Sequence, residues 1–233
     1  MYSAHNILGC LELNGEAGQG CETAKQAKAA LRCYARALEA RNGPPGADDV
    51  VLYTNIAGAH SFLQQDDDAL EALATARSLV PKGSHAEAQV ALQMATMSYT
   101  KGGAGREGKA LKFLEHWRDN TVTLCATMCA FCQQHRRDDD ARLLTCGQCS
   151  VCRYCCPEHQ KEHWKLPRKP SGAGLLANNA NRVSHKSSCI LLKNWRLARK
   201  GRVTREACLP DMLKFLQEQC EPAHTDAQAR SGK

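Results

Sequence analysis

The sequence predicts a mainly α-helical protein in which antiparallel helix hairpins precede a small metal-stapled finger and a C-terminal helix. From residue 22 to 118, apolar residues at helical spacing alternate with short turns rich in Gly, Pro or Asp. Nine of the 14 cysteines lie between Cys125 and Cys189, in a stretch too short to fold without staples. We therefore divide the chain into 22–118, 125–189 and 190–233.

The cysteines indicate the compartment. No apolar run approaches the roughly 20 residues of a membrane helix, and the N-terminus lacks the basic start and apolar stretch of a signal peptide. We expect an intracellular protein of the cytoplasm or nucleus, without membrane attachment, in which thiols stay reduced. There, CxxC pairs are more often metal ligands than disulfides.

The charge gives weaker information. Of the net charge of +7, much comes from KNWRLARKGRVTR after Lys193, which predicts a solvated basic segment. Contact with RNA or acidic partners is the alternative. Because +7 falls short of a strong polyanion-binding charge, we do not expect a nucleic-acid partner.

The helical half is organised as helix, short turn, helix. NGPPGADD, QDDD and KGGAGREG form turns, and Pro81 ends a helix. The expected helices are 22–41, 50–64, 69–79, 86–99 and 109–118.

One unit of this half resembles a tetratricopeptide (TPR) repeat. Its small positions let two helices approach and its bulky positions fill the gap to the next repeat. The matching residues are Tyr53, Ile56, Ala57, His60, Ala69, Leu73, Ala76 and Pro81. Less complete units are suggested by Ala30, Tyr34 and Ala37 before it, and by Ala95, Tyr99, Ala110, Leu114 and Trp117 after it. The alternative is a generic helical bundle without a groove.

The resemblance implies a peptide-binding face on the first helices of the repeats. Asn55 would lie there, as a solvated or helix-bonding residue. The matching positions of the next unit, Val90 and Met94, are apolar. We therefore expect no clamp for a chain-terminal carboxylate.

The cysteine-rich half contains four ligand pairs. Structural zinc takes four thiolate or imidazole ligands in a tetrahedron. Two CxxC pairs are followed by two pairs with three residues between their members, which makes eight ligands and two zinc ions. The ligands are Cys129, Cys132, Cys146, Cys149, Cys155, His159, His185 and Cys189.

The run MCAFC…LTCGQCSVCRYCCPEHQKEHW…HKSSC resembles a MYND-type zinc finger. Tyr154 before Cys155, Gln160, the His163–Trp164 step and the closing HKSSC all match that family's pattern. The resemblance implies a cross-brace. One zinc would be held by Cys129, Cys132, Cys155 and His159, and the other by Cys146, Cys149, His185 and Cys189.

Two departures from the family pattern stand out. His159 replaces a cysteine, although three thiolates and one imidazole form an ordinary zinc set. A Pro-, Gly- and Asn-rich insertion at 166–184 precedes His185 and predicts a loop, either genuine or an artefact of the gene model. Lengthening a loop from about 2 to about 20 residues costs about 2 kcal/mol. Zinc binding supplies about 10–16 kcal/mol, so we expect the site to survive.

Cys152 and Cys156 are left over inside the finger. A second register would pair Cys152 with Cys155 and recruit His135 or His163. In the family register, His163 is a surface neighbour of Trp164, and Trp164 packs on the finger or on a partner. Cys125 is expected to be a small buried residue.

The expected function is protein interaction. With all eight ligands supplied by the chain, both zinc sites are closed, which is typical of structural sites, and no catalytic set stands out. We therefore expect not an enzyme but a zinc-dependent adaptor that binds short peptide segments of partner proteins. The alternatives are an accessory subunit or fragment of a SET-type lysine methyltransferase, and a RING-like ubiquitin ligase. A helix bearing Leu209, Met212, Leu213 and Leu216 is expected to pack back, before a disordered tail from residue 221.

Overall fold

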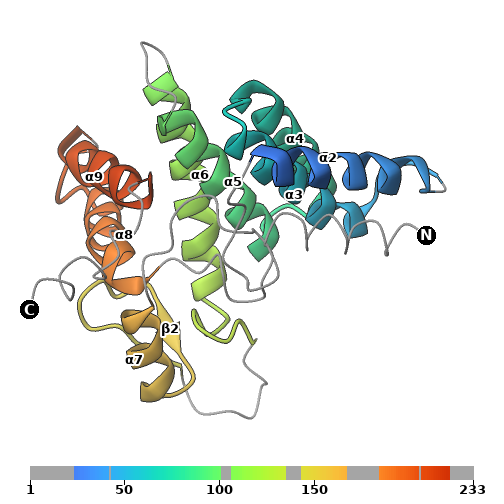
Figure 1. Ribbon diagram of the computed structural model, residues 1–233. Helices are drawn as coiled ribbons and strands as arrows, with labels where there is room; N and C mark the ends of the chain where they lie inside the picture. The colour runs from blue at the N-terminus through green and yellow to red at the C-terminus, as the bar shows by residue number, and fades with distance from the viewer. Residues whose placement is uncertain are drawn as a thin grey trace, which may run out of the picture.

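The computed structural model describes residues 24–41, 43–100, 106–134, 143–166, 184–204 and 206–220. The mainly helical prediction is confirmed (Figure 1). The elements are α2 (Ala24–Glu39), η1 (Ala47–Asp49), α3 (Val50–Phe62), α4 (Asp66–Leu79), α5 (His85–Thr100), α6 (Arg106–Cys125), β1 (Leu144–Thr145), β2 (Arg153–Tyr154), α7 (Pro157–Lys165), α8 (His185–Arg199), η2 (Glu206–Cys208) and α9 (Leu209–Cys220). The expectations for His135, for 167–183 within the insertion and for the tail from 221 lie outside these ranges.

The first helices pack as antiparallel neighbours, α3 against α4 and α5 against α6 (Figure 1). The small and bulky positions of the repeat pattern lie inside. Ala69, Leu73 and Ala76 of α4 are fully buried, and so are Ala30, Tyr34 and Ala37 of α2. The same holds for Ala95, Ala110 and Leu114 in the next pair. Burial of small residues brings these helices close together, as the pattern requires.

Two helix boundaries differ from the prediction. The three aspartates of QDDD do not form a turn but the first turn of α4, where negative charge is stabilised by the positive end of the helix. Helix α6 does not end at residue 118 but continues to Cys125. The last helix of the hairpins therefore leads directly into the cysteine-rich half, and Cys125 is buried, as expected.

The predicted peptide-binding face is not open at the positions named for it. Asn55 is 2% exposed, so of its two expected roles, solvated or helix-bonding, the solvated one is wrong. Val90 and Met94 are buried in a core cluster with Ala57 and Leu73. These positions therefore hold adjacent helices together instead of facing solvent.

The basic segment after Lys193 keeps Lys193, Arg199 and Lys200 exposed, as expected, but it also takes part in the core. Most of it belongs to α8, where Leu191, Leu192 and Trp195 are buried. Helix α9 packs back as predicted, and its Met212 and Leu216 join the core of α5 and α6, although Leu209 remains 38% exposed. Within the described ranges, no helix is both long and apolar enough to span a bilayer.

Candidate metal centre

Each CxxC pair lies in a tight loop of the same form. After the first pair, the backbone N–H of Gln133 donates to the carbonyl of Cys129 across 2.9 Å; after the second, Ser150 donates to Cys146 across 2.8 Å. Gln133 and Ser150 both adopt a left-handed backbone, with φ of 60° and 55°, which is uncommon for residues other than glycine. The two loops thus turn both thiols of a pair toward one point.

The remaining ligand pairs lie at the starts of helices. Cys155 precedes α7 and His159 lies in its first turn, while His185 and Cys189 are one turn apart in α8. The strands β1 and β2 pair antiparallel, with Leu144 opposite Tyr154. This short ribbon connects the second CxxC loop to the Cys155 pair.

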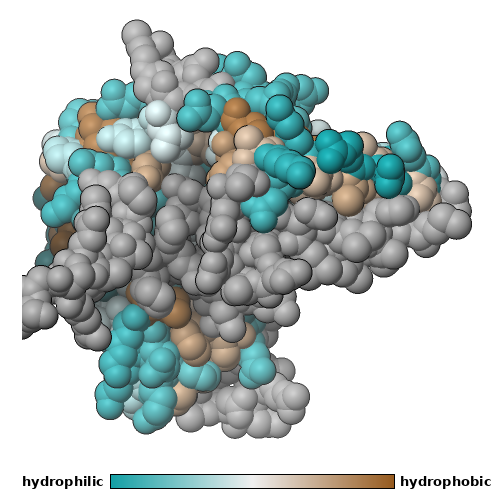
Figure 2. Space-filling view, viewed as in Figure 1, coloured by the Kyte–Doolittle hydropathy of each residue, from teal (hydrophilic) through white to brown (hydrophobic). Residues whose placement is uncertain are grey.

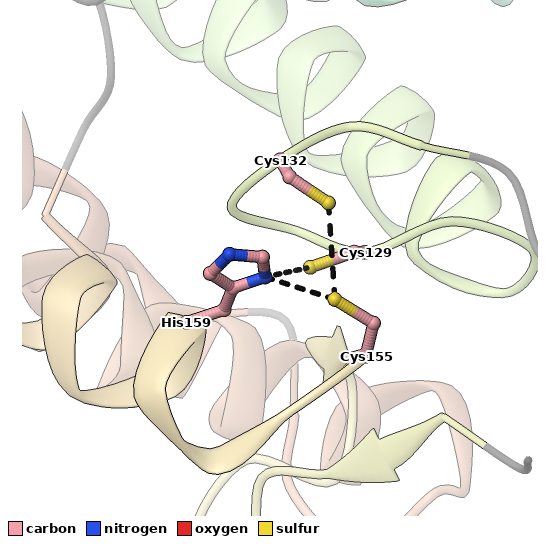
Figure 3. A group of neighbouring side chains, drawn as sticks. All are labelled: Cys129, Cys132, Cys155 and His159. Atoms are coloured by element: carbon pink, nitrogen blue, oxygen red, sulfur yellow. Dashed lines mark hydrogen bonds between the residues drawn. The ribbon is translucent and has the colours of Figure 1, made fainter.

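The first group consists of Cys129, Cys132, Cys155 and His159, whose ligand atoms all lie within 4.8 Å of one another. His159 Nδ1 is 2.9 Å from Cys155 Sγ and 3.7 Å from Cys129 Sγ, and the Cys132 and Cys155 sulfurs are 3.9 Å apart (Figure 3). Thiolates at 2.3 Å from a tetrahedral zinc stand about 3.8 Å apart. The donor set and its spacing therefore fit zinc.

The second group consists of Cys146, Cys149, His185 and Cys189, and all four are buried. His185 Nε2 is 3.2 Å from Cys146 Sγ and 3.7 Å from Cys149 Sγ. Its ring centroid is 5.7 Å from Trp164 and 6.0 Å from Tyr154. Aromatic packing thus holds this imidazole toward the sulfurs.

The eight predicted ligands are therefore brought together in the cross-braced arrangement, with pairs one and three in one group and pairs two and four in the other. The insertion does not separate the fourth pair from its partners. Ser184 Oγ donates to the Trp164 carbonyl across 3.2 Å, so the chain re-enters the finger close to where it left. Ser184 also accepts from the N–H of Lys186 and caps α8.

The thiols show the electrostatics of a metal site. Burial works to raise the pKa of Cys129, but backbone N–H groups of Cys132, Cys155 and Phe131 outweigh it and lower this pKa to about 7. Hydrogen bonding from Cys152, chiefly, lowers the pKa of Cys149, and the N–H of Val151 also donates to Cys149 Sγ. Burial and the neighbouring Cys129 raise the pKa of Cys155 to about 12. Part of this rise reflects repulsion between neighbouring thiolates. A bound zinc dication would offset this repulsion and deprotonate the thiols.

The finger residues that belong to neither ligand group have structural roles. Cys152 is 2% exposed and belongs to neither group of four, so the register that pairs it with Cys155 is not the one the fold assembles. His163 is not a surface residue, because it is 8% exposed and its Nδ1 lies 3.2 Å from the Tyr154 hydroxyl. Trp164 packs on the finger through His185 but remains 36% exposed.

The finger's surface has a hydrophilic part and a hydrophobic part. Figure 2 shows hydrophilic side chains over α7 and a hydrophobic patch beside that helix, toward the rest of the molecule. Phe131, between the first two ligands, has its ring centroid 5.0 Å from that of His159. A ligand of the first group thus packs against an aromatic side chain that the sequence pattern did not single out.

Comparison with protein families gave a match to the MYND finger over residues 129–169. The chain therefore contains a MYND finger. Members of this family bind zinc and act in protein interactions, and each of the two groups could hold one zinc ion. Searches of curated proteins and of solved structures gave no match. The match ends before His185 and Cys189 and leaves out the helical half, so the TPR-like repeat stays a prediction.

Proposed function

We propose that the chain is a zinc-dependent adaptor that binds short peptide segments of partner proteins through its MYND finger and its helical repeats. The observation that carries this proposal is the pair of four-ligand groups. A catalytic zinc keeps one position for water or substrate, whereas four protein ligands close the site. Zinc here stabilises a small surface instead of activating a reactant.

The same observation supports a non-enzymatic role. A SET-type methyltransferase would need a β-rich catalytic domain. Among the described residues, the strands are β1 and β2, of two residues each. A RING-like ligase also uses a cross-brace, but the MYND match favours a peptide-binding finger. An autoubiquitination assay that yields ubiquitin chains would revive the ligase reading.

The test joins metal content to binding. The full chain would be purified without added metal, analysed for zinc, and used to capture proteins from a cell extract, with captured proteins confirmed by direct binding to purified material. Cys155→Ser would remove a ligand of the first group, and Cys156→Ser would remove the adjacent thiol, which belongs to neither group. We expect two zinc ions per chain for the parent and for Cys156→Ser, and loss of zinc and partner together for Cys155→Ser.

Partner binding that survives both Cys155→Ser and chelation would overturn the zinc-dependent adaptor. Zinc retained at two per chain in Cys155→Ser would instead remove this cysteine from the ligand set.

A further inference from the structure

A groove of about 700 Å³ lies where the end of α7 meets α8 and α9. Its apolar surface comes from Trp164 and Leu166 at the end of α7 and from Ile190 on α8, and beneath them lies Phe215 of α9, which is 2% exposed. Ile190 is 49% exposed and Trp164 is 36% exposed, and both are among the large apolar side chains left open to solvent. A concave surface with exposed apolar side chains is typical of a binding site.

Side chains of both charges line the groove. Lys165, Lys186 and Lys214 line it, all three are exposed, and none forms a salt bridge within the described part of the chain. Two carboxylates also line it: Asp211, which accepts from the amide of Asn194, and Glu218, which also has a partner. The lysines outnumber them, so the groove offers a ligand three ammonium groups and a net positive charge around an apolar floor.

The start of α8 adds to this field. Ser184, Lys186 and Ser187, from the cap and first turn of this 15-residue helix, line the groove. The N-terminus of a helix carries a partial positive charge. Its contribution has the same sign as the three lysines and does not depend on side-chain conformation.

We propose that this groove binds an acidic peptide segment carrying a large apolar side chain, supplied by a partner protein. The inference rests on the adaptor role proposed above and names the chemistry of its partner. The apolar side chain would sit against Ile190, Phe215 and Trp164, and acidic residues on either side would meet the lysines. Complementary charge of this kind sets specificity and raises the association rate, and like charges brought together disfavour binding.

A nucleic acid would satisfy the lysines but not the floor. Binding of a polyanion alone needs a line of phosphate contacts and leaves apolar surface unused. Ile190 and Phe215 instead favour a side chain that is itself apolar. A polypeptide with mixed acidic and apolar residues matches both features.

The test is a selection from a library of random peptides on the zinc-loaded full chain. Enriched peptides should combine net negative charge with Leu, Ile, Phe or Trp. Their affinity, measured by fluorescence anisotropy, should fall about tenfold or more in Lys186→Glu/Lys214→Glu, because two attractions become repulsions. Ile190→Asp should weaken binding as well. Lys161→Glu/Lys200→Glu is the matched control, because it makes the same change of charge at two exposed lysines outside the groove.

Each of the other possible results would contradict a different part of the proposal. Zinc-dependent peptides that are neutral or basic, or that bind the groove variant as tightly as the parent, would overturn the groove and leave the adaptor intact. Single-stranded oligonucleotide that binds more tightly than any peptide, and is lost in the groove variant, would overturn the peptide ligand. If zinc-dependent binding of peptides is absent altogether, the adaptor falls and this inference with it.

Discussion

The side-chain amide of Gln133 donates a hydrogen bond to Nε2 of His85 across 2.8 Å. Gln133 directly follows the first CxxC pair, and His85 is the first residue of α5. The contact joins the first metal group to the helical hairpins across 48 positions of sequence. Nearby, Cys125 and Val122 of α6 share one core cluster with Cys129, Cys149 and Leu192. The finger is thus built onto the helices.

We expect this contact to couple the stabilities of the two halves. In a double-mutant cycle with Gln133→Ala and His85→Ala, the coupling energy should be about 0.5–1.5 kcal/mol, as for a typical hydrogen bond. Zinc content should remain unchanged, because neither residue is in a ligand group. Denaturant unfolding of the four proteins measures the coupling.

The control is Gln148→Ala, which removes the same side-chain type from the other CxxC loop. Gln148 is exposed, so its loss should change stability by less than about 0.5 kcal/mol. A coupling energy of zero between Gln133 and His85 would mean that the halves are joined by other contacts.

Loss of the second metal group should damage more than the finger. Cys149→Ser should reduce zinc to at most one per chain, since the group is fully buried and has four members. Helix α8 supplies two of its ligands and also places Leu191 in the core shared by α5, α6 and α9. Circular dichroism on heating should therefore show a lower melting temperature for the helices, not only for the finger. Cys33→Ser, in α2 and outside both groups, should melt like the parent.

The metal groups could be predicted from sequence because each ligand pair is local. A CxxC loop or a helical turn fixes two donors whatever the rest of the chain does. Only the pairing of pairs needs tertiary information, and the family pattern supplied it. His159 fits because an imidazole at a cysteine position still reaches the common centre, 2.9 Å from Cys155 Sγ.

The errors arise where long-range packing decides. Lys193 and Arg199 are exposed, as expected of a basic segment, yet Trp195 between them is buried, with Arg118 of α6 over its ring. Asn55 and His163 are polar and were expected at the surface, but packing encloses both. The contact between Gln133 and His85 could not be foreseen, because no spacing rule links residues so far apart.

A buried hydrogen-bond network around Glu87 of α5 gives a pH-dependent prediction. Glu87 is 6% exposed and receives hydrogen bonds from the N–H of Gly83 at 2.6 Å and from Asn120 at 3.1 Å. His116 Nε2 lies 2.8 Å from its other oxygen. Burial works to raise the pKa of Glu87, but these hydrogen bonds outweigh it, led by that of Gly83, and hold the pKa below its ordinary value.

A carboxylate with a lowered pKa stabilises the fold above its unfolded pKa, about 4.3. That contribution is lost as the pH falls through the lower folded value. Glu87→Gln should therefore cost about 1–3 kcal/mol at neutral pH, and the difference from the parent should shrink in acid. Glu107→Gln, at an exposed site in the first turn of α6, is the control. A difference from the parent that is constant from neutral pH to acid would show that the Glu87 charge does not act.

The last prediction concerns Trp195, which ties the segment after the finger to α6. Two guanidinium groups lie over its ring, with Arg118 at 5.0 Å and Arg199 at 5.1 Å from the centroid. Trp195→Ala removes both the buried ring and the stacking partner, and should cost about 3–5 kcal/mol. Arg199→Ala leaves the ring in place and should cost only about 0.5–1 kcal/mol, because that guanidinium lies at an exposed position. Urea unfolding would measure both, and equal losses in the two variants would mean that stacking with Arg199, not burial of the indole, accounts for the cost of losing Trp195.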